Sequence, residues 1–206
     1  MAKKAILVVS FGTSVNATRE KTIDRIEADI QKAMPDRAFY RAWTSGMIIR
    51  KIEKRDDVHI NTVEEAMKQM LLDGITDVIV QPTHVIRGIE YDQLKEAVLE
   101  RRSQFEQVRI GTPLLTTSED TDEVLQAVMA EIGTIEKEEA VVFMGHGTPH
   151  DSNSVYTELD QRLKNFIAAE KKRGRKISQK EFVIGLIEQA LAEYEAQNQT
   201  EETTNE

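Results

Sequence analysis

The chain has 206 residues, enough for one large domain or two small ones, and a formal net charge of −9. So acidic a chain is a poor candidate for non-specific nucleic-acid binding, which needs a basic face. The absence of cysteine excludes disulfides, thiolate metal sites and cysteine nucleophiles. No segment has the length and apolar character of a signal peptide or a membrane span. We therefore expect a cytoplasmic protein with no nucleic-acid or membrane partner.

Short apolar, β-branched runs alternate with helical stretches. Strands are expected at 5–11, 38–43, 77–81, 108–111 and 140–144, and helices at 16–34, 45–54, 61–72, 90–102, 118–132 and 156–170. This alternation predicts an α/β fold with a parallel sheet flanked by helices. Ligands of such sheets bind beyond the carboxyl ends of the strands, so the segments that follow each strand are where a site is expected.

Residues 8–13 resemble residues 142–148, because each is an apolar strand that runs into a Gly-Thr turn. The likeness indicates a domain-sized repeat, or a chance similarity between two strands that end in glycine turns. We expect a complete N-terminal α/β domain over 1–135, a partial second domain with C-terminal helices over 136–197, and a disordered tail over 198–206. The segment 178–197 is amphipathic and opens with a capping-box pattern, which favours a packing or dimerisation helix.

The strongest chemical signal is Met144-Gly145-His146-Gly147-Thr148-Pro149-His150, directly after the fifth expected strand. Glycines on both sides of His146 allow a ligand to approach the backbone closely and leave the imidazole uncovered. A neutral imidazole binds Co²⁺, Ni²⁺, Fe²⁺ or Zn²⁺ and can accept a pyrrole proton. The alternative is a turn histidine whose ring is satisfied by its neighbours.

A second group of polar residues follows the third strand: His84, Arg87, Glu90 and Tyr91. Arg87 could pair with a carboxylate-rich substrate, and Glu90 could bind metal or accept protons. Alternatively, Glu90 is an ordinary carboxylate in a helix's first turn and His84 is a buried residue at the strand's end.

The first and second strands lead into further candidates. Ser10, Phe11 and Thr13 lie where the first strand turns, and Trp43 and Arg50 flank the turn after the second. Aromatic and apolar side chains here could form a wall for a flat macrocycle. Ordinary packing of a helix on the sheet is the alternative, and it is favoured for Ile48 and Ile49.

Four segments in the same order resemble the anaerobic sirohydrochlorin cobalt chelatases: 4–14, 41–51, 111–115 and 142–148. The resemblance covers residues 1 to about 165. It implies two similar α/β domains that face each other across a tetrapyrrole of the sirohydrochlorin or precorrin-2 type. It also implies that His146 is a metal-binding and catalytic histidine.

The family's second histidine, in a Gly-Asp-His segment, and a metal-binding glutamate have no counterpart after His150, so the second domain looks truncated. By pseudo-symmetry, Gly88-Ile89-Glu90 corresponds to Gly-Asp-His, which makes Glu90 a second metal-binding candidate. The substrate-binding candidates are Ser10, Phe11, Thr13, Trp43, Arg50, His84, Arg87 and Tyr91.

The resemblance predicts a chelatase that inserts Co²⁺, or alternatively Fe²⁺ or Ni²⁺, into the tetrapyrrole in cobalamin or sirohaem biosynthesis. The divalent metal is a substrate, and no organic cofactor is expected. A second chain in a homo-oligomer could supply the missing wall. The alternatives are a truncated, non-catalytic remnant that binds tetrapyrrole or metal, and a small interaction module that uses the 178–197 helix.

Overall fold

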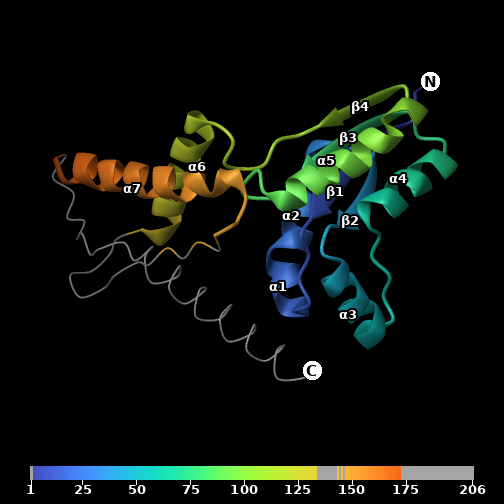
Figure 1. Ribbon diagram of the computed structural model, residues 1–206, viewed down its shortest axis with the longest axis horizontal. Helices are drawn as coiled ribbons and strands as arrows, with labels where there is room; N and C mark the ends of the chain where they lie inside the picture. Colours follow the sequence, from blue (N-terminus) through green and yellow to red (C-terminus); the bar gives the residue numbers. More distant parts are fainter. Residues whose placement is uncertain (1, 134–142, 144, 146, 173–206) are drawn as a thin grey trace, which may run out of the picture. The chain divides into compact units, whose positions relative to one another are not determined.

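The computed structural model describes residues 2–133, 143, 145 and 147–172 (Figure 1). The chain forms two compact units, the first ending at Thr116 and the second beginning at Thr117. The expected strand at 140–144 lies outside the described residues except for Phe143, and so do the 178–197 segment and the tail. In the described part of the chain, no helix is long and apolar enough to cross a membrane.

The first unit is built on a parallel sheet of four strands in the order β2-β1-β3-β4. The strands are β1 (Lys4–Ser10), β2 (Ala38–Trp43), β3 (Asp77–Pro82) and β4 (Gln107–Ile110). Each lies within one residue of its expected bounds, and the α/β class is confirmed. β1 pairs with β2 on one side and β3 on the other, and its residues from Ala5 to Ser10 are almost completely buried. Continuous burial explains its unbroken apolar sequence.

Helices cover both faces of this sheet. They are α1 (Asn16–Lys21), α2 (Ile23–Ala33), α3 (Gly46–Asp56), α4 (Val63–Leu72) and α5 (Ile89–Arg101), followed by the short 3₁₀ helix η1 (Arg102–Gln104). Leu7 and Val9 of β1 share a core with the apolar faces of α4 and α5. On the other face, Arg41 of β2 is held by Asp24 and Glu27 of α2. Figure 1 shows α1 and α3 beyond the carboxyl ends of β1 and β2.

The single helix expected over 16–34 is wrong, because the structure has two helices separated at Thr22. The φ and ψ of Thr22, −123° and −80°, are not helical, and its hydroxyl donates to the carbonyl of Thr18 at 2.7 Å. A threonine that bonds back to the preceding turn competes with the regular ladder. In addition, α1 contains no buried residue, so no packing force aligns it with α2.

The helix expected from Asn61 begins at Val63, with Thr62 as its cap. The Thr62 hydroxyl accepts from the amide of Glu65, and the Glu65 carboxylate accepts from the amide of Thr62 at 2.8 Å. This reciprocal capping box satisfies two amides that the helix leaves unpaired. It fixes the residue at which α4 begins.

The second unit contains α6 (Ser118–Ile132), the 3₁₀ helix η2 (Asp151–Asn153) and α7 (Ser154–Lys172) in its described part. The bounds of α6 match those expected, and Thr117 and Asp120 form a second capping box. Arg162 of α7 donates to Asp122 of α6 at 2.8 Å. The two helices therefore hold each other by polar contacts near the buried Leu163.

Candidate functional site

The strand order places the sheet's topological switch point, here named the crevice, at the carboxyl ends of β1 and β3. From β1 the chain crosses to β2 on one side, and from β3 it crosses to β4 on the other. The two connections leave in opposite directions, and the space between them is the usual ligand position of an open parallel sheet. The described candidate residues from the first unit all follow, or lie at the end of, one of these strands.

The floor of the crevice is a set of hydrogen bonds between strand ends. Ser10, which is 1% exposed, accepts a hydrogen bond at 2.8 Å from the hydroxyl of Thr83. The Thr83 amide donates to Val9 at 2.9 Å, and the Thr44 amide donates to the Ser10 carbonyl at 3.0 Å. The loops after β1, β2 and β3 are thereby tied together at one point, and the Ser10 hydroxyl is used within the protein.

His84 lies beside this floor. Its Nε2 is 3.4 Å from the Thr44 hydroxyl, and its buried Nδ1 has no hydrogen-bond partner among the described residues. Burial lowers the pKa of His84, and the nearby Glu90 carboxylate opposes that shift only in part. The ring is therefore neutral near pH 7, and a neutral imidazole has one nitrogen able to accept a proton or a metal.

The start of α5 supplies the remaining polar candidates on this side. Glu90 lies in the helix's first turn, beside Gly88, and Arg87 just before it is exposed. The Tyr91 side chain is nearly buried, and its hydroxyl donates to the Gly111 carbonyl at 3.2 Å, which joins α5 to the segment after β4. Tyr91 thus supports the crevice wall that carries Arg87 and Glu90.

The loop after β1 rests on Trp43. Gly12 has a φ of +98°, and a Cβ there would lie 2.6 Å from Cε3 of Trp43. Trp43, expected as an aromatic wall, is completely buried, so in this structure it supports the loop from beneath. Thr13 accepts from the Val15 amide at 3.3 Å and stabilises the turn. Phe11 is 48% exposed.

Arg50 of α3 folds back over the start of its own helix. Its Nη1 lies 3.2 Å from the position that a Cβ at Gly46 would occupy. Gly46 therefore leaves room for this guanidinium beside the carboxyl end of β2. A guanidinium held there is suited to pair with a carboxylate or phosphate.

Every strand is followed by a large apolar side chain that is exposed. Phe11 follows β1, Met47 follows β2 and is 75% exposed, Val85 follows β3, and Leu114 follows β4. Soluble proteins seldom expose several large apolar side chains at one edge unless a ligand or partner covers them. The edge thus combines apolar surface with guanidinium, carboxylate and imidazole groups.

His146, the central candidate, lies outside the described residues. The ring of the neighbouring His150 is used locally: its Nδ1 accepts from the Ser152 amide at 3.1 Å and caps η2. Within the described ranges, no group of three histidine or acidic side chains could hold a metal ion. A metal contact by Glu90 or His146 therefore stays a prediction.

Sequence reasoning assigned no role to Thr44, Thr83 or Arg55. Thr44 and Thr83 bind His84 and Ser10, respectively. Arg55 contacts the loop after β1 from the far end of α3. The only sequence signal for Thr44 and Thr83 is that each directly follows a strand. No local pattern identifies Arg55, because its contact joins α3 to a loop that is distant in the sequence.

The model of the family described as "Cobalt chelatase (CbiK)" matches residues 4–172. A sirohydrochlorin cobaltochelatase of Salmonella typhimurium is 41% identical over 161 residues, which are 78% of this chain and 61% of that protein. The sirohydrochlorin cobaltochelatase CbiKC of Nitratidesulfovibrio vulgaris is 34% identical over 165 residues, covering 77% of this chain and 57% of that protein.

The chain thus spans about 60% of the length of these curated relatives. The family match extends over every helix and strand of the first unit and over α6 and α7 of the second. The expected family is confirmed by this match, and the chain belongs to the cobalt chelatase (CbiK) family.

Proposed function

We propose that the chain acts as a sirohydrochlorin cobaltochelatase, which inserts Co²⁺ into a sirohydrochlorin-type tetrapyrrole in cobalamin biosynthesis. The observation that carries the proposal is the set of groups that follow the carboxyl ends of the strands, where exposed apolar side chains occur together with an imidazole, a guanidinium and a carboxylate. Family membership and the names of both relatives support the same activity.

The substrate's shape fits the distribution of groups at this edge. A tetrapyrrole has flat, largely apolar faces and a rim of acidic side chains. Phe11, Met47 and Val85 offer apolar surface to a face, and Arg50 and Arg87 pair with the rim carboxylates. Tyr91 supports the segment that carries Arg87, and Trp43 supports the loop that carries Phe11.

The reaction replaces two pyrrole N–H protons with one divalent metal ion. His146 binds the incoming Co²⁺ through a neutral imidazole, since nitrogen ligands suit this ion. Glu90 supplies a carboxylate that can share the metal or take a proton. His84, neutral because burial lowers its pKa, does not repel the incoming cation.

A small number of protein ligands on the metal ion favours its transfer to the macrocycle. A metal held by one imidazole and one carboxylate is bound weakly enough to be passed to four pyrrole nitrogens. The same ligand set accepts Fe²⁺ and Ni²⁺, so the choice of Co²⁺ rests on the relatives' names. Insertion of Fe²⁺ would instead connect the chain to sirohaem biosynthesis.

A second copy of the chain is proposed to complete the site. The crevice described here is built from the first unit alone. A macrocycle with two faces needs a second wall, and a homo-oligomer would place another apolar edge against it. Activity that rises faster than linearly with protein concentration would support this arrangement.

Binding without catalysis is the second candidate function. The described residues support it, because among them no group of three histidine or acidic side chains could hold a metal ion. In that case the chain binds sirohydrochlorin or the metal and leaves the insertion rate unchanged.

Two anaerobic measurements separate these candidates. Equilibrium binding of sirohydrochlorin is followed by absorbance, and Co²⁺ insertion is then followed in the same mixture, with His59→Ala as a control histidine variant. If the chain is a chelatase, the wild type and His59→Ala both bind the macrocycle and both accelerate insertion. Binding at the uncatalysed insertion rate supports the second candidate, and absence of binding of both sirohydrochlorin and Co²⁺ contradicts both candidates.

A further inference from the structure

The segment between β1 and α2 places none of its own side chains fully in the hydrophobic core. Residues 11–22 contain no buried residue, and α1 has none. A segment with so little apolar burial belongs to the least stable part of a structure. Yet it begins with Phe11 and Thr13, which are proposed to bind the substrate, so its position needs another source of stability.

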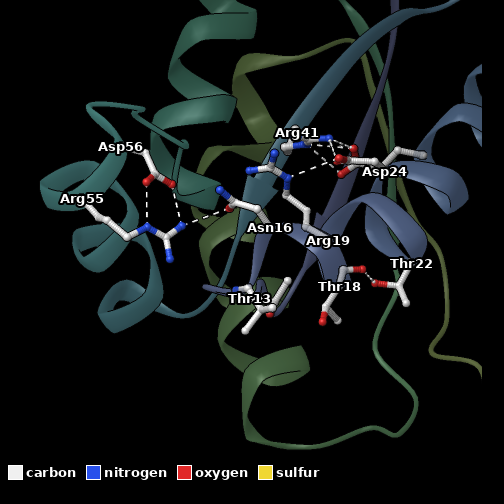
Figure 2. Close-up of polar contacts among 11 residues, drawn as sticks. Thr13, Asn16, Thr18, Arg19, Thr22, Asp24, Arg41, Arg55 and Asp56 are labelled. Atoms are coloured by element: carbon white, nitrogen blue, oxygen red, sulfur yellow. Dashed lines mark hydrogen bonds and ion pairs between the residues drawn. The ribbon is translucent and has the colours of Figure 1, made fainter.

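That source is a polar clamp formed by Arg55, in the last turn of α3. The guanidinium of Arg55 donates to the Ser14 carbonyl at 2.6 Å through Nη1 and to Oδ1 of Asn16 at 3.0 Å through Nη2. Figure 2 shows Arg55 between Asn16 on one side and Asp56 on the other. The clamp therefore joins residues that are about forty positions apart in the sequence.

Asp56 holds the guanidinium in the orientation that the clamp needs. Its two carboxylate oxygens accept from Nε and Nη2 of Arg55 at 2.7 and 2.6 Å. A planar guanidinium fixed on one edge presents its remaining donors in a defined direction. A lysine has a single charged nitrogen and could not make this set of contacts from one position.

The other anchors of the segment lie on either side of the clamp. Before it, the Ser45 amide donates to the Phe11 carbonyl at 3.2 Å, and Gly12 rests on Trp43. After it, Arg19 bonds to Asp24 of α2 at 3.2 Å (Figure 2). Arg55 is thus the contact that fixes the middle of the segment.

We propose that Arg55 is a positioning residue that holds the loop after β1 against α3, so that the loop keeps a constant distance from Arg50. This inference rests on the proposed function, because it assumes that a tetrapyrrole binds at this edge. Arg50 and Arg55 lie on the same helix. One rigid element therefore supports both a group that pairs with the substrate's carboxylates and the loop that carries Phe11.

The test compares Arg55→Gln and Arg55→Lys with the wild-type chain. Anaerobic binding of sirohydrochlorin is measured by the fluorescence of Trp43, the only tryptophan, and hydrogen exchange is measured for the amides of residues 11–19. We expect both variants to bind about tenfold more weakly, since each loses charge-assisted hydrogen bonds. Exchange should become faster in residues 11–19 and stay unchanged in β1, β3 and α4.

The control is Lys4→Gln, which removes the exposed ion pair with Asp36 and should change neither measurement. Unchanged binding by Arg55→Gln, full rescue by Arg55→Lys, or faster exchange across the whole first unit would overturn the inference. If the wild-type chain itself does not bind sirohydrochlorin, the proposed function and the positioning role both fail. The exchange data would then still show whether Arg55 clamps the loop.

Discussion

The hydroxyl of Thr83, just after β3, donates a 2.8 Å hydrogen bond to the buried hydroxyl of Ser10 at the end of β1. This bond closes the floor of the crevice at the point where the two chain connections diverge. We expect Thr83→Val to reduce the free energy of unfolding by about 1–2 kcal/mol, because the Ser10 hydroxyl stays buried without this donor.

A double-mutant cycle with Ser10→Ala isolates this bond. Denaturant unfolding of the two single variants and the double variant should give a coupling energy, with the double variant less destabilised than the sum of the two. Additive losses would mean that the two hydroxyls do not interact in solution.

Gly12→Ala should be more damaging than the same change at another glycine with positive φ. Gly12 has a φ of +98°, and a Cβ there would lie 2.6 Å from Trp43, whereas Gly74 has a φ of +73° with nothing within 4 Å. Backbone strain alone predicts a loss of about 1 kcal/mol for Gly74→Ala. Gly12→Ala adds a collision with a rigid ring, for a total of about 3 kcal/mol.

Thermal or denaturant unfolding gives both values, and the fluorescence of Trp43 should change only in Gly12→Ala. Equal losses at the two positions would show that the loop moves freely away from the tryptophan.

Alkaline stability should depend on Tyr40. The Tyr40 hydroxyl donates to Asp73 at 2.6 Å, and burial together with this carboxylate raises the pKa of Tyr40 from 10.0 to about 12. Because the pKa of the Tyr40 phenol is raised in the folded protein, its contribution to the free energy of unfolding is fully present below pH 10.0. This contribution is lost as the pH rises through about 12.

A spectrophotometric titration of the folded protein should therefore contain a phenol with a pKa of about 12 that disappears in Tyr40→Phe and shifts downward in Asp73→Asn. A Tyr40→Phe variant with an unaltered titration curve would contradict the assignment.

Acid stability should depend on Asp77, at the amino end of the inner strand β3. Hydrogen bonds from the Arg37 guanidinium, and next from that of Arg109, hold the pKa of Asp77 below its ordinary 3.8. The stabilisation is present above pH 3.8 and is lost as the pH falls through the lowered pKa. Asp77→Asn also leaves the nearly buried Arg37 without its anion, at a cost of about 3 kcal/mol near neutral pH.

Unfolding by urea at a series of pH values checks both statements. The difference in the free energy of unfolding between the wild type and Asp77→Asn should shrink in acid. Asp36→Asn, which removes an exposed ion pair, should change the free energy of unfolding little at any pH. A difference that stays constant down to the most acidic condition would exclude Asp77 as the titrating group.

Much of the described fold follows from local sequence. The strand Ala38–Trp43 and the helix Ser118–Ile132 have the bounds that their patterns predict, because apolar periodicity and capping residues act over a few positions. The break at Thr22 was missed, since it depends on α1 having no buried face. The Arg55 clamp could not be predicted either, because it joins α3 to a loop that only the tertiary fold brings near.

The candidate site likewise has features that local sequence predicts and features that depend on the tertiary fold. Position after a strand was enough to select His84, Glu90 and Arg50, and the structure brings them to one edge of one sheet. The burial of Trp43 was not foreseen, because an aromatic residue at a strand's end can face either the core or a ligand.

The central claim is tested most directly by the initial rate of anaerobic Co²⁺ insertion into sirohydrochlorin, compared between the wild-type chain and His146→Ala. We predict a wild-type rate well above the uncatalysed one and a variant rate close to it, with macrocycle binding retained in both proteins. Equal wild-type and variant rates, or a wild-type rate no higher than the uncatalysed one, would contradict the claim that this chain is a chelatase using His146.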